Sequence, residues 1–498
     1  MGLFWLVPVL PSSGMGIYWS FPIIIFWMVL RLLQVLSSPE KPKLYYRTSG
    51  SPFIQAILES CPILTQIFRP TVLWGKSGHF QTVVHVKMGR TKPRWPDSQR
   101  FHIPMPDGAT MSYDLFDPHE EGHRAKFTLA LCPGIANSSE CIYLRTFASY
   151  AQTHGFRVAI LNHLGALKSE KLTSPRIFTY GGTEEYSRMV DHLLEQYPDT
   201  KILAVGFSMG GNIVTKYLGE SLDNQKKVLC GMSVCQGYEI NEAKVLFMQW
   251  SNLRRVYTYL MTLNQRRLLS RHRDFLFSKQ AQEKCGTFRE KDVFSATSLL
   301  AVDENYSRIR AGFKSAYEYY RKHSSAYVLQ NIKVPMLFMN AEDDPICPPS
   351  LYKHARQFAE KTDNCIFMTT KHGGHLGYFE GGVLIPDNVT WLDRVIIEYA
   401  DAVTSLYLHG KLPQQTGSLL VSSDEIEADD IETTFDSGIS DHSSWERKSA
   451  SSEGSVSPVS GVMASVKDVA DNTKEKDEEK RDSLKRGSLL KQASTFVQ

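Results

Sequence analysis

Gly206-Phe207-Ser208-Met209-Gly210-Gly211 stands between an apolar run at 201–205 and a segment of helical character at 212–218. The pattern G-x-S-x-G between a strand and a helix is typical of a nucleophile elbow, a sharp turn that raises a serine hydroxyl above a sheet. Glycines flank the serine because larger side chains would clash with the neighbouring elements. The helix that follows directs the positive end of its dipole at the hydroxyl. The stretch therefore predicts Ser208 as a nucleophile.

Two later loops offer the acid and the base that a serine nucleophile needs. The partners of this elbow follow it in the order acid, then histidine. Asp343 and Asp344 come after one predicted strand, and His372 and His375 come after the next. We expect Asp344 to be the acid because it begins a D-x-[IV]-x-P pattern, with Asp343 bracing the loop. We expect His375 to be the base because two glycines let its loop approach Ser208, and His372 is then an ordinary loop histidine.

An oxyanion hole for this serine would use two backbone N–H groups. One belongs to Met209, which directly follows the nucleophile. The other belongs to the loop 132–135, where Pro133-Gly134 forms a turn that would aim the amide of Ile135 inward. We therefore predict Met209 and Ile135 as the donors.

Strands alternating with helices indicate a mostly parallel sheet with helices on both faces, an α/β fold. The predicted strands lie at 127–131, 156–161, 201–205, 228–234, 334–339 and 364–369, and the predicted helices at 139–154, 183–197, 212–218 and 389–406. A hairpin is expected at 101–116 and a further strand at 78–86. Thr183 is expected to cap its helix.

Residues 236–330 interrupt this alternation with a long, mostly helical segment. An insertion at this place lies over the carboxyl ends of the strands, where ligands bind. We predict that it is a lid, apolar beneath and basic outside.

A second candidate motif is His102 to Asp107, an H-x4-D pattern linked with acyltransferases. The plainer interpretation is a turn, since two prolines and a turn aspartate explain the same residues. Both interpretations stay open at this point.

The N-terminal residues 1–43 predict a membrane anchor because the run at 17–36 is apolar almost throughout and long enough to span a bilayer. Cations follow the run and none precedes it, which favours a cytoplasmic catalytic domain. Three N-x-[ST] sequons, at Asn137, Asn305 and Asn388, would be glycosylated only in a lumenal or extracellular domain. We expect a single-pass protein of the plasma membrane or endoplasmic reticulum, with the side of its domain open.

The domain is expected to span residues 44–410, followed by a disordered tail at 411–498. Serine and charged residues dominate the tail, which cannot bury enough apolar surface to order itself.

Composition excludes several classes of function. The 498 residues carry a net charge of +3, so nothing indicates a nucleic-acid partner. The eight cysteines show no C-x-x-C spacing, which predicts neither a metal site nor a disulfide framework, although an isolated disulfide is compatible with an oxidising compartment. No cofactor is expected.

Several further motifs, taken together, resemble the AB hydrolase superfamily 4 family over roughly residues 15–405. The motifs are Cys132-Pro133-Gly134-Ile135-Ala136-Asn137-Ser138-Ser139-Glu140, Asn162-His163-Leu164-Gly165-Ala166, Thr173-Ser174-Pro175-Arg176, the elbow extended to Val214, Val234-Cys235-Gln236-Gly237-Tyr238 and His372-Gly373-Gly374-His375-Leu376-Gly377. The chain departs from the family at Met209, where leucine is common, and in its long tail.

The resemblance implies an α/β-hydrolase fold with Ser208, Asp344 and His375 as the catalytic residues. It also implies a membrane-bound monoacylglycerol lipase, with broader esterase and triacylglycerol lipase activity, and an extracytoplasmic domain. Two alternatives remain: an acyltransferase that uses the same acyl-enzyme, and a receptor that binds a small lipid or steroid on a hydrolase scaffold. The complete Ser-Asp-His order favours an enzyme.

Overall fold

The computed structural model describes residues 14–48, 51–87, 98–120 and 122–413, and the side chains of the first helix from residue 22. Within these residues the chain forms a nine-stranded sheet in the order β1-β9-β8-β7-β6-β4-β5-β3-β2. The strands are β1 Lys43–Tyr45, β2 Gln99–Pro104, β3 Thr110–Phe116, β4 Phe127–Cys132, β5 Arg157–Asn162, β6 Lys201–Phe207, β7 Val228–Val234, β8 Met336–Ala341 and β9 Cys365–Thr370.

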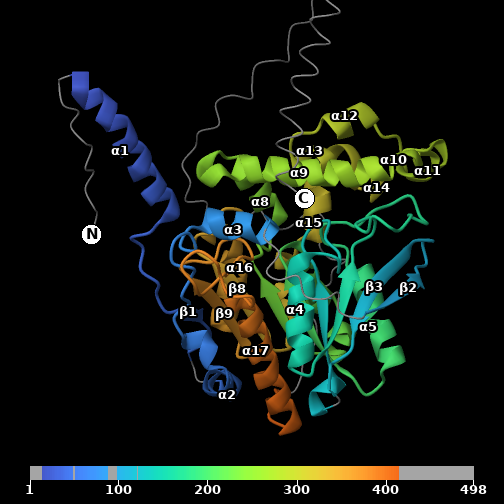
Figure 1. Cartoon of the computed structure of the whole chain (residues 1–498). Helices are drawn as coiled ribbons and strands as arrows, with labels where there is room; N and C mark the ends of the chain where they lie inside the picture. The colour runs from blue at the N-terminus through green and yellow to red at the C-terminus, as the bar shows by residue number, and fades with distance from the viewer. Residues whose placement is uncertain (1–13, 49–50, 88–97, 121, 414–498) are drawn as a thin grey trace, which may run out of the picture. The chain divides into compact units, whose positions relative to one another are not determined.

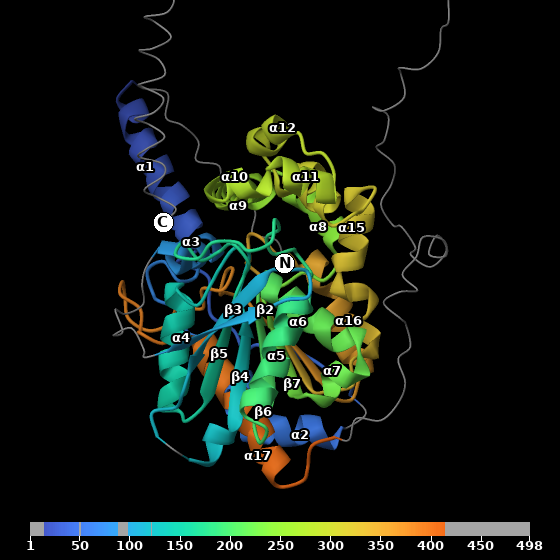
Figure 2. The ribbon, with the colours of Figure 1, turned by 90° about the vertical axis from the view of Figure 1, so that its right-hand side faces the viewer.

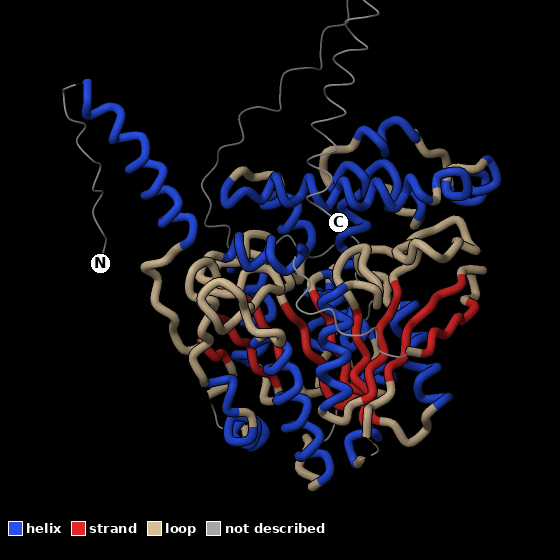
Figure 3. The backbone as a smooth tube through the Cα atoms, in the orientation of Figure 1, coloured by secondary structure: helices blue, strands red, loops and turns tan. Residues whose placement is uncertain are grey.

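Six adjacent strands, from β9 through β8, β7, β6 and β4 to β5, run parallel to one another. Antiparallel pairs close both edges, with β1 on β9 and with β3 on β5 and β2 on β3. Parallel strands place their carboxyl ends on one side of a sheet, so the loops after β4, β6, β7, β8 and β9 gather there (Figure 3).

Helices account for about half of the remaining described residues. They are α1 Gly14–Leu33, α2 Pro52–Ser60, α3 Gly78–Lys87, α4 Ile142–Thr153, α5 Glu184–Gln196, α6 Met209–Glu220, α7 Leu222–Lys226, α8 Ile240–Phe247, α9 Arg254–Arg271, α10 Arg273–Leu276, α11 Lys279–Cys285, α12 Glu290–Ser295, α13 Leu299–Val302, α14 Arg308–Arg310, α15 Ala316–His323, α16 Lys353–Lys361 and α17 Trp391–Leu408. The short turns are η1 Pro62–Thr65, η2 His123–Lys126, η3 Ser251–Leu253, η4 Asp303–Ser307, η5 Ser325–Tyr327, η6 Leu329–Asn331 and η7 Pro349–Tyr352.

Apolar side chains cover the sheet on both faces. One core joins α2, α4 and α17 to one face, and the other joins α5, α6 and α16 to the opposite face (Figures 1 and 2). The strands at the centre are buried along their whole length except at Lys201, the first residue of β6, which explains why they are nearly continuous apolar runs in the sequence. The predicted α/β architecture is confirmed in this layered arrangement.

The predicted strand at 78–86 is wrong, because these residues form helix α3. Its buried residues Gly78, Gln81 and Thr82 follow helical spacing, which an alternation of period two does not describe. The helix that begins at Glu184 is correctly placed, but Thr183 makes no side-chain cap and donates instead to Glu220 Oε2 at 2.7 Å.

The H-x4-D pattern is part of a hairpin turn. Asp107 accepts a hydrogen bond from the Ala109 amide at 3.2 Å and pairs with Arg176. His102 Nε2 lies 2.8 Å from Glu170 Oε1. His102 and Asp107 therefore have different partners and do not contact each other as an acyltransferase pair. The interpretation of Asp107 as a turn residue is confirmed.

The segment between β7 and β8 contains the helices α8 to α15, which lie over the carboxyl ends of the strands in Figures 1 and 2. This is the position expected for the insertion at 236–330. Its action as a lid stays a prediction.

At the N-terminus, α1 contains Pro22 and carries Arg31 in its last turn. Among the described residues, no helix is both long and apolar enough to cross a bilayer. The predicted spanning anchor over residues 1–43 is therefore not supported, and residues 1–13 of it lie outside the described range.

The structure also describes the three sequon asparagines and most of the cysteines. Asn137 Nδ2 donates to Tyr143 at 3.3 Å and Asn305 Nδ2 donates to Ala301 at 2.8 Å, whereas Asn388 is exposed. Glycosylation stays a prediction. The seven cysteines that the structure describes are free thiols. The predicted tail lies outside the described residues from 414 onward.

Candidate active site

The turn between β6 and α6 presents Ser208 in a backbone conformation that L residues rarely adopt, with φ 52° and ψ −124°. Neighbouring main chain leaves no room for side chains around it. A Cβ at Gly206 would lie 2.2 Å from the Gly210 oxygen, and a Cβ at Gly210 would lie 2.0 Å from the Cys132 oxygen. The Ser208 amide donates to Val234 at 2.8 Å. A strained residue held this firmly is characteristic of a functional turn.

Three side chains from three loops meet in an unbroken chain of hydrogen bonds. Ser208 Oγ lies 2.8 Å from His375 Nε2, and His375 Nδ1 lies 2.8 Å from Asp344 Oδ2. Asp344 is 2% exposed and His375 is 8% exposed, so both are shielded from bulk water. We call these three residues the active triad. A carboxylate on Nδ1 leaves Nε2 to accept the serine proton, which is the arrangement required of a general base.

Backbone amides orient the acid of the active triad. Asp344 Oδ1 accepts from the amides of Ile346 at 2.7 Å and Cys347 at 2.9 Å. The second oxygen is then left to face His375. The D-x-[IV]-x-P pattern thus marks a turn that fixes the carboxylate rather than a direct contact with substrate.

Helix α3 supports the base, a role that was not predicted because this segment was expected to be a strand. Thr82 Oγ1 accepts from the His375 amide at 2.9 Å and itself donates to the Gly78 oxygen at 2.7 Å. Gln81 holds the same loop through Phe379, donating to its oxygen at 3.1 Å and accepting from its amide at 2.8 Å. The spacing of Gly78, Gln81 and Thr82 at i, i+3 and i+4 could have indicated a helix with a small and polar face.

A second set of the same residue types takes its acid and its histidine from the same two loops. It consists of Ser37, His372 and Asp343, which we call the linker triad. Ser37 Oγ lies 3.1 Å from His372 Nε2, but His372 Nδ1 lies 3.7 Å from Asp343 Oδ2. Asp343 Oδ1 accepts from the Gly374 amide at 2.8 Å, which is the bracing role expected for this residue. His372 is buried rather than an ordinary exposed loop residue, and it joins the catalytic loop to the segment after α1.

The predicted oxyanion donors border the nucleophile. Met209 is the first residue of α6, where helix geometry leaves the amide without an intrahelical partner. The turn that precedes Ile135 touches the nucleophile, since a Cβ at Gly134 would lie 3.5 Å from the Ser208 Cβ. Among the described residues, the Ile135 amide has no hydrogen-bond acceptor.

Two buried side chains fix the turn before Ile135. Tyr143 Oη accepts from the Gly134 amide at 3.3 Å, and His163 Nε2 lies 3.0 Å from the Pro133 oxygen. Burial lowers the pKa of His163 to about 4, so the ring is neutral near pH 7 and its N–H donates to this carbonyl. Neither role was predicted from the sequence.

One group of described residues has the spacing of a metal site, namely Cys235, Asp344 and His375. Burial raises the pKa of the Cys235 thiol, whereas metals bind the thiolate. The imidazole and the carboxylate are already bonded to each other. These contacts favour the triad over a metal ion as the use of this group.

Helix α9 of the helical insertion contacts α3, the helix that supports His375. Tyr257 stacks on His79 of α3 with their planes 10° apart, and its hydroxyl lies 2.9 Å from His79 Nδ1. Burial and the nearby charge of Asp344 raise the pKa of Tyr257 to about 12. Tyr257 therefore joins the insertion to α3, the helix that supports His375.

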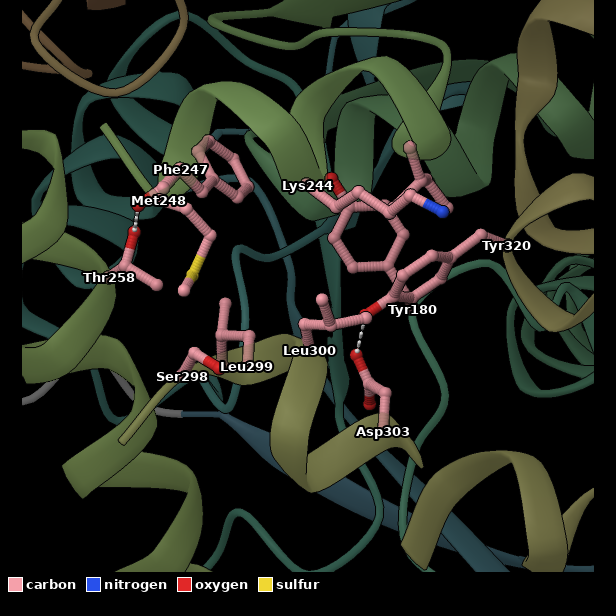
Figure 4. A pocket seen from close by; sticks show the side chains of 11 residues that line it. Tyr180, Lys244, Phe247, Met248, Thr258, Ser298, Leu299, Leu300, Asp303 and Tyr320 are labelled. Carbon is pink, nitrogen blue, oxygen red and sulfur yellow. Dashed lines mark hydrogen bonds between the residues drawn. The ribbon is translucent and has the colours of Figure 1, made fainter. Parts of the chain in front are cut away.

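A pocket opens within the insertion, where Tyr180 from outside the insertion completes its lining (Figure 4). Its lining residues are Tyr180, Ile240, Lys244, Phe247, Met248, Thr258, Ser298, Leu299, Leu300, Asp303 and Tyr320. Tyr180 accepts a hydrogen bond from Gln236 at 3.0 Å, just beyond the end of β7. Tyr320 donates to Asp303 at 2.7 Å, and burial raises the pKa of Asp303 to about 6. The pocket is therefore mostly apolar, with Lys244, Asp303 and two tyrosines as its titratable groups.

Comparison with known proteins gives consistent results. A family model described as alpha/beta hydrolase fold matches residues 128–382, a range that contains the active triad. A monoacylglycerol lipase ABHD2 of Mus musculus is 44% identical over 400 residues, which cover 80% of this chain and 93% of the relative. One of Danio rerio is 47% identical over 357 residues, covering 71% and 84%. An abhydrolase domain-containing protein 2 of Drosophila melanogaster is 41% identical over 390 residues, covering 78% and 97%.

Proposed function

Because this chain belongs to the alpha/beta hydrolase fold family, we propose that it is a serine hydrolase of lipid carboxylic esters whose principal substrates are monoacylglycerols. The observation that carries this proposal is the pair of 2.8 Å hydrogen bonds in the active triad. The relatives named monoacylglycerol lipase support the choice of ester.

The mechanism follows from the contacts of the active triad. Ser208 Oγ attacks the ester carbonyl while His375 Nε2 accepts its proton, and Asp344 stabilises the imidazolium that forms. The amides of Met209 and Ile135 donate to the oxyanion. The proton then passes from His375 to the departing glycerol oxygen, which leaves the acyl group on Ser208. Water repeats the sequence and releases the fatty acid.

Substituting the nucleophile tests the proposal directly. Ser208→Ala should abolish both hydrolysis of monoacylglycerol and labelling by a fluorophosphonate, because the remaining groups cannot form an acyl-enzyme. Ser60→Ala, at an exposed serine of α2, is the matched control and should retain both. A folded Ser208→Ala protein that is still labelled and active would refute the assignment.

Product analysis separates hydrolysis from the alternatives. Fatty acid as the main product in the presence of added glycerol is expected of a lipase, whereas new acylglycerol would indicate acyl transfer. Binding of a small lipid or steroid that survives Ser208→Ala and drives a response without turnover would indicate a receptor. A panel of mono-, di- and triacylglycerols would show how far the activity extends beyond monoacylglycerol.

The proposed place of action is a membrane, because long-chain monoacylglycerols partition into bilayers. The apolar residues of α1 that are exposed support this proposal. Fractionation of cells that express the full chain tests it, and sensitivity of the protein to an N-glycosidase would identify the side on which the domain lies.

A further inference from the structure

Five apolar side chains form an exposed surface on two segments that lie more than 300 positions apart in the sequence. They are between 43% and 76% exposed, and we call them the apolar rim: Val72, Leu73, Val383, Leu384 and Ile385. No charged residue occurs from Gly381 to Pro386. Contiguous exposed apolar surface on an ordered domain usually marks a contact with a partner or a lipid phase.

Main-chain contacts hold the two segments of the apolar rim together. The amides of Val72 and Leu73 donate to the oxygens of Gly382 and Val383 at 3.2 and 3.0 Å. Trp74 Nε1 donates to the Leu384 oxygen at 2.8 Å. The turn itself needs glycine, because a Cβ at Gly382 would lie 1.9 Å from the Ile385 oxygen and φ is +59°. The apolar side chains are thus displayed outward on a fixed backbone.

The apolar rim is continuous with the loop that carries the catalytic base. Only seven positions separate His375 from Gly382, and between them the Tyr378 amide donates to the Gly373 oxygen at 3.1 Å. Gln81 ties Phe379 to α3 and also donates to the Gly75 oxygen at 2.7 Å. The apolar rim is therefore joined to the loop of His375 by a short segment that α3 holds in place.

Helix α1 enters the domain at the same place. Lys76 Nζ donates to the Val35 oxygen at 2.6 Å, only two positions after the Trp74 that holds the rim. Residues Ile23 to Val29 of α1 are between 38% and 64% exposed. Figures 1 and 2 both show the orange loop before α17 close to α3, at the edge of the domain from which α1 leaves.

We propose that the apolar rim docks the domain onto a lipid bilayer, with Val383, Leu384 and Ile385 inserted among the acyl chains beside the active triad. The proposal rests on the lipase function proposed above and names the surface through which its substrate arrives. The nearby contact of Lys76 with Val35, just after a helix whose residues Ile23 to Val29 are apolar and exposed, favours a bilayer over a protein partner. Docking at this edge would place the catalytic loop where a monoacylglycerol leaves the membrane.

The test compares two substrates in the full chain. The variant V383S/L384S/I385S should lose about tenfold or more in kcat/KM on a long-chain monoacylglycerol in phosphatidylcholine vesicles, because apolar side chains no longer insert. Its kcat/KM on the soluble ester p-nitrophenyl butyrate should stay within about twofold, since the active triad is unchanged. Leu408→Ser is the matched control, at a residue that is 55% exposed and ends α17, and it should match the wild type on both substrates.

The outcomes are separable. An unchanged rate on vesicles would overturn the docking role while leaving the lipase assignment intact, and a wild type that hydrolyses neither ester would overturn the proposed function. A wild type that self-associates through the rim, with a monomeric variant of full vesicle activity, would show that a second copy covers this surface. If the triple variant does not fold, V72S/L73S carries the same expectations.

Discussion

The active triad and the linker triad contain the same residue types and take their acid and histidine from the same two loops, yet only one has the geometry of a catalyst. Both hydrogen bonds of the active triad measure 2.8 Å. In the linker triad the histidine and acid atoms are 3.7 Å apart, which is too far for a hydrogen bond. Its serine follows α1 and is not on a strand-to-helix turn. Residue type alone therefore does not identify a nucleophile. The strand-to-helix turn that carries Ser208 and the backbone amides that orient Asp344 identify it.

The two acids differ most clearly. Asp344 has partners for both oxygens, from Ile346, Cys347 and His375. Asp343 Oδ2 has no hydrogen-bond partner, and burial raises the pKa of this carboxyl. Asp344 is therefore arranged to stabilise a positive charge on its histidine, whereas Asp343 mainly holds the Gly374 amide.

The largest effect should come from removing the charge of each acid in turn. Asp344→Asn should lower kcat by about 10³- to 10⁴-fold, because an amide next to Nδ1 selects the wrong histidine tautomer. Asp343→Asn should lower it less than about tenfold, since the asparagine oxygen can still accept from Gly374. Steady-state hydrolysis of a soluble ester measures both. Equal losses in the two variants would break the distinction between the triads.

A smaller effect should appear in the pH dependence of stability. Burial, assisted by the charge of Asp344, raises the pKa of Asp343 above its ordinary value of 3.8, against the opposing contacts of His372 and Gly374. Ionising this carboxyl therefore costs more in the folded protein than in the unfolded one. The folded state loses stability as pH rises through the window between the ordinary and the raised pKa.

Asp343→Asn removes this loss of stability. The melting temperature of the variant minus that of the wild type should therefore increase as the pH is raised from 4 to 8. Thermal unfolding at a series of pH values measures it. Asp223→Asn, at an exposed acid whose pKa the Lys226 ammonium lowers, is the control and should show no such gain. If the difference in melting temperature between Asp343→Asn and the wild type does not change with pH, ionisation of the buried Asp343 is not its cause.

The sheet and the elbow could be predicted from the sequence because each depends on local pattern. Buried parallel strands are continuous apolar runs, and β7 was predicted to the residue. The elbow needs glycine at positions 206 and 210 because a Cβ there would clash with main-chain oxygens, and the same clash arises wherever this turn occurs. The predicted acid and base are brought together with Ser208 because strand order places their loops on one edge.

Contacts between distant segments could not be predicted in this way. Helix α3 was predicted as a strand because its buried face consists of residues that contact a distant segment. Gln81 and Thr82 bond to the loop that carries His375. The apolar rim likewise arises only when Leu73 and Val383 are paired. The contact of His372 with Ser37 spans 335 positions, and nothing near either residue in the sequence indicates it.

The smallest effect concerns that contact. Ser37→Ala removes the partner of His372 Nε2, which should lower the free energy of unfolding by about 1 kcal/mol, the usual net value of one hydrogen bond. It should leave kcat/KM on a soluble ester within about twofold, because the linker serine touches no atom of the active triad. Ser38→Ala, at the exposed neighbouring serine, should change neither quantity. A large loss of activity in Ser37→Ala alone would mean that the two triads are coupled through the His372–His375 loop, and the contrast between a structural set and a catalytic one would have to be replaced by a single extended network.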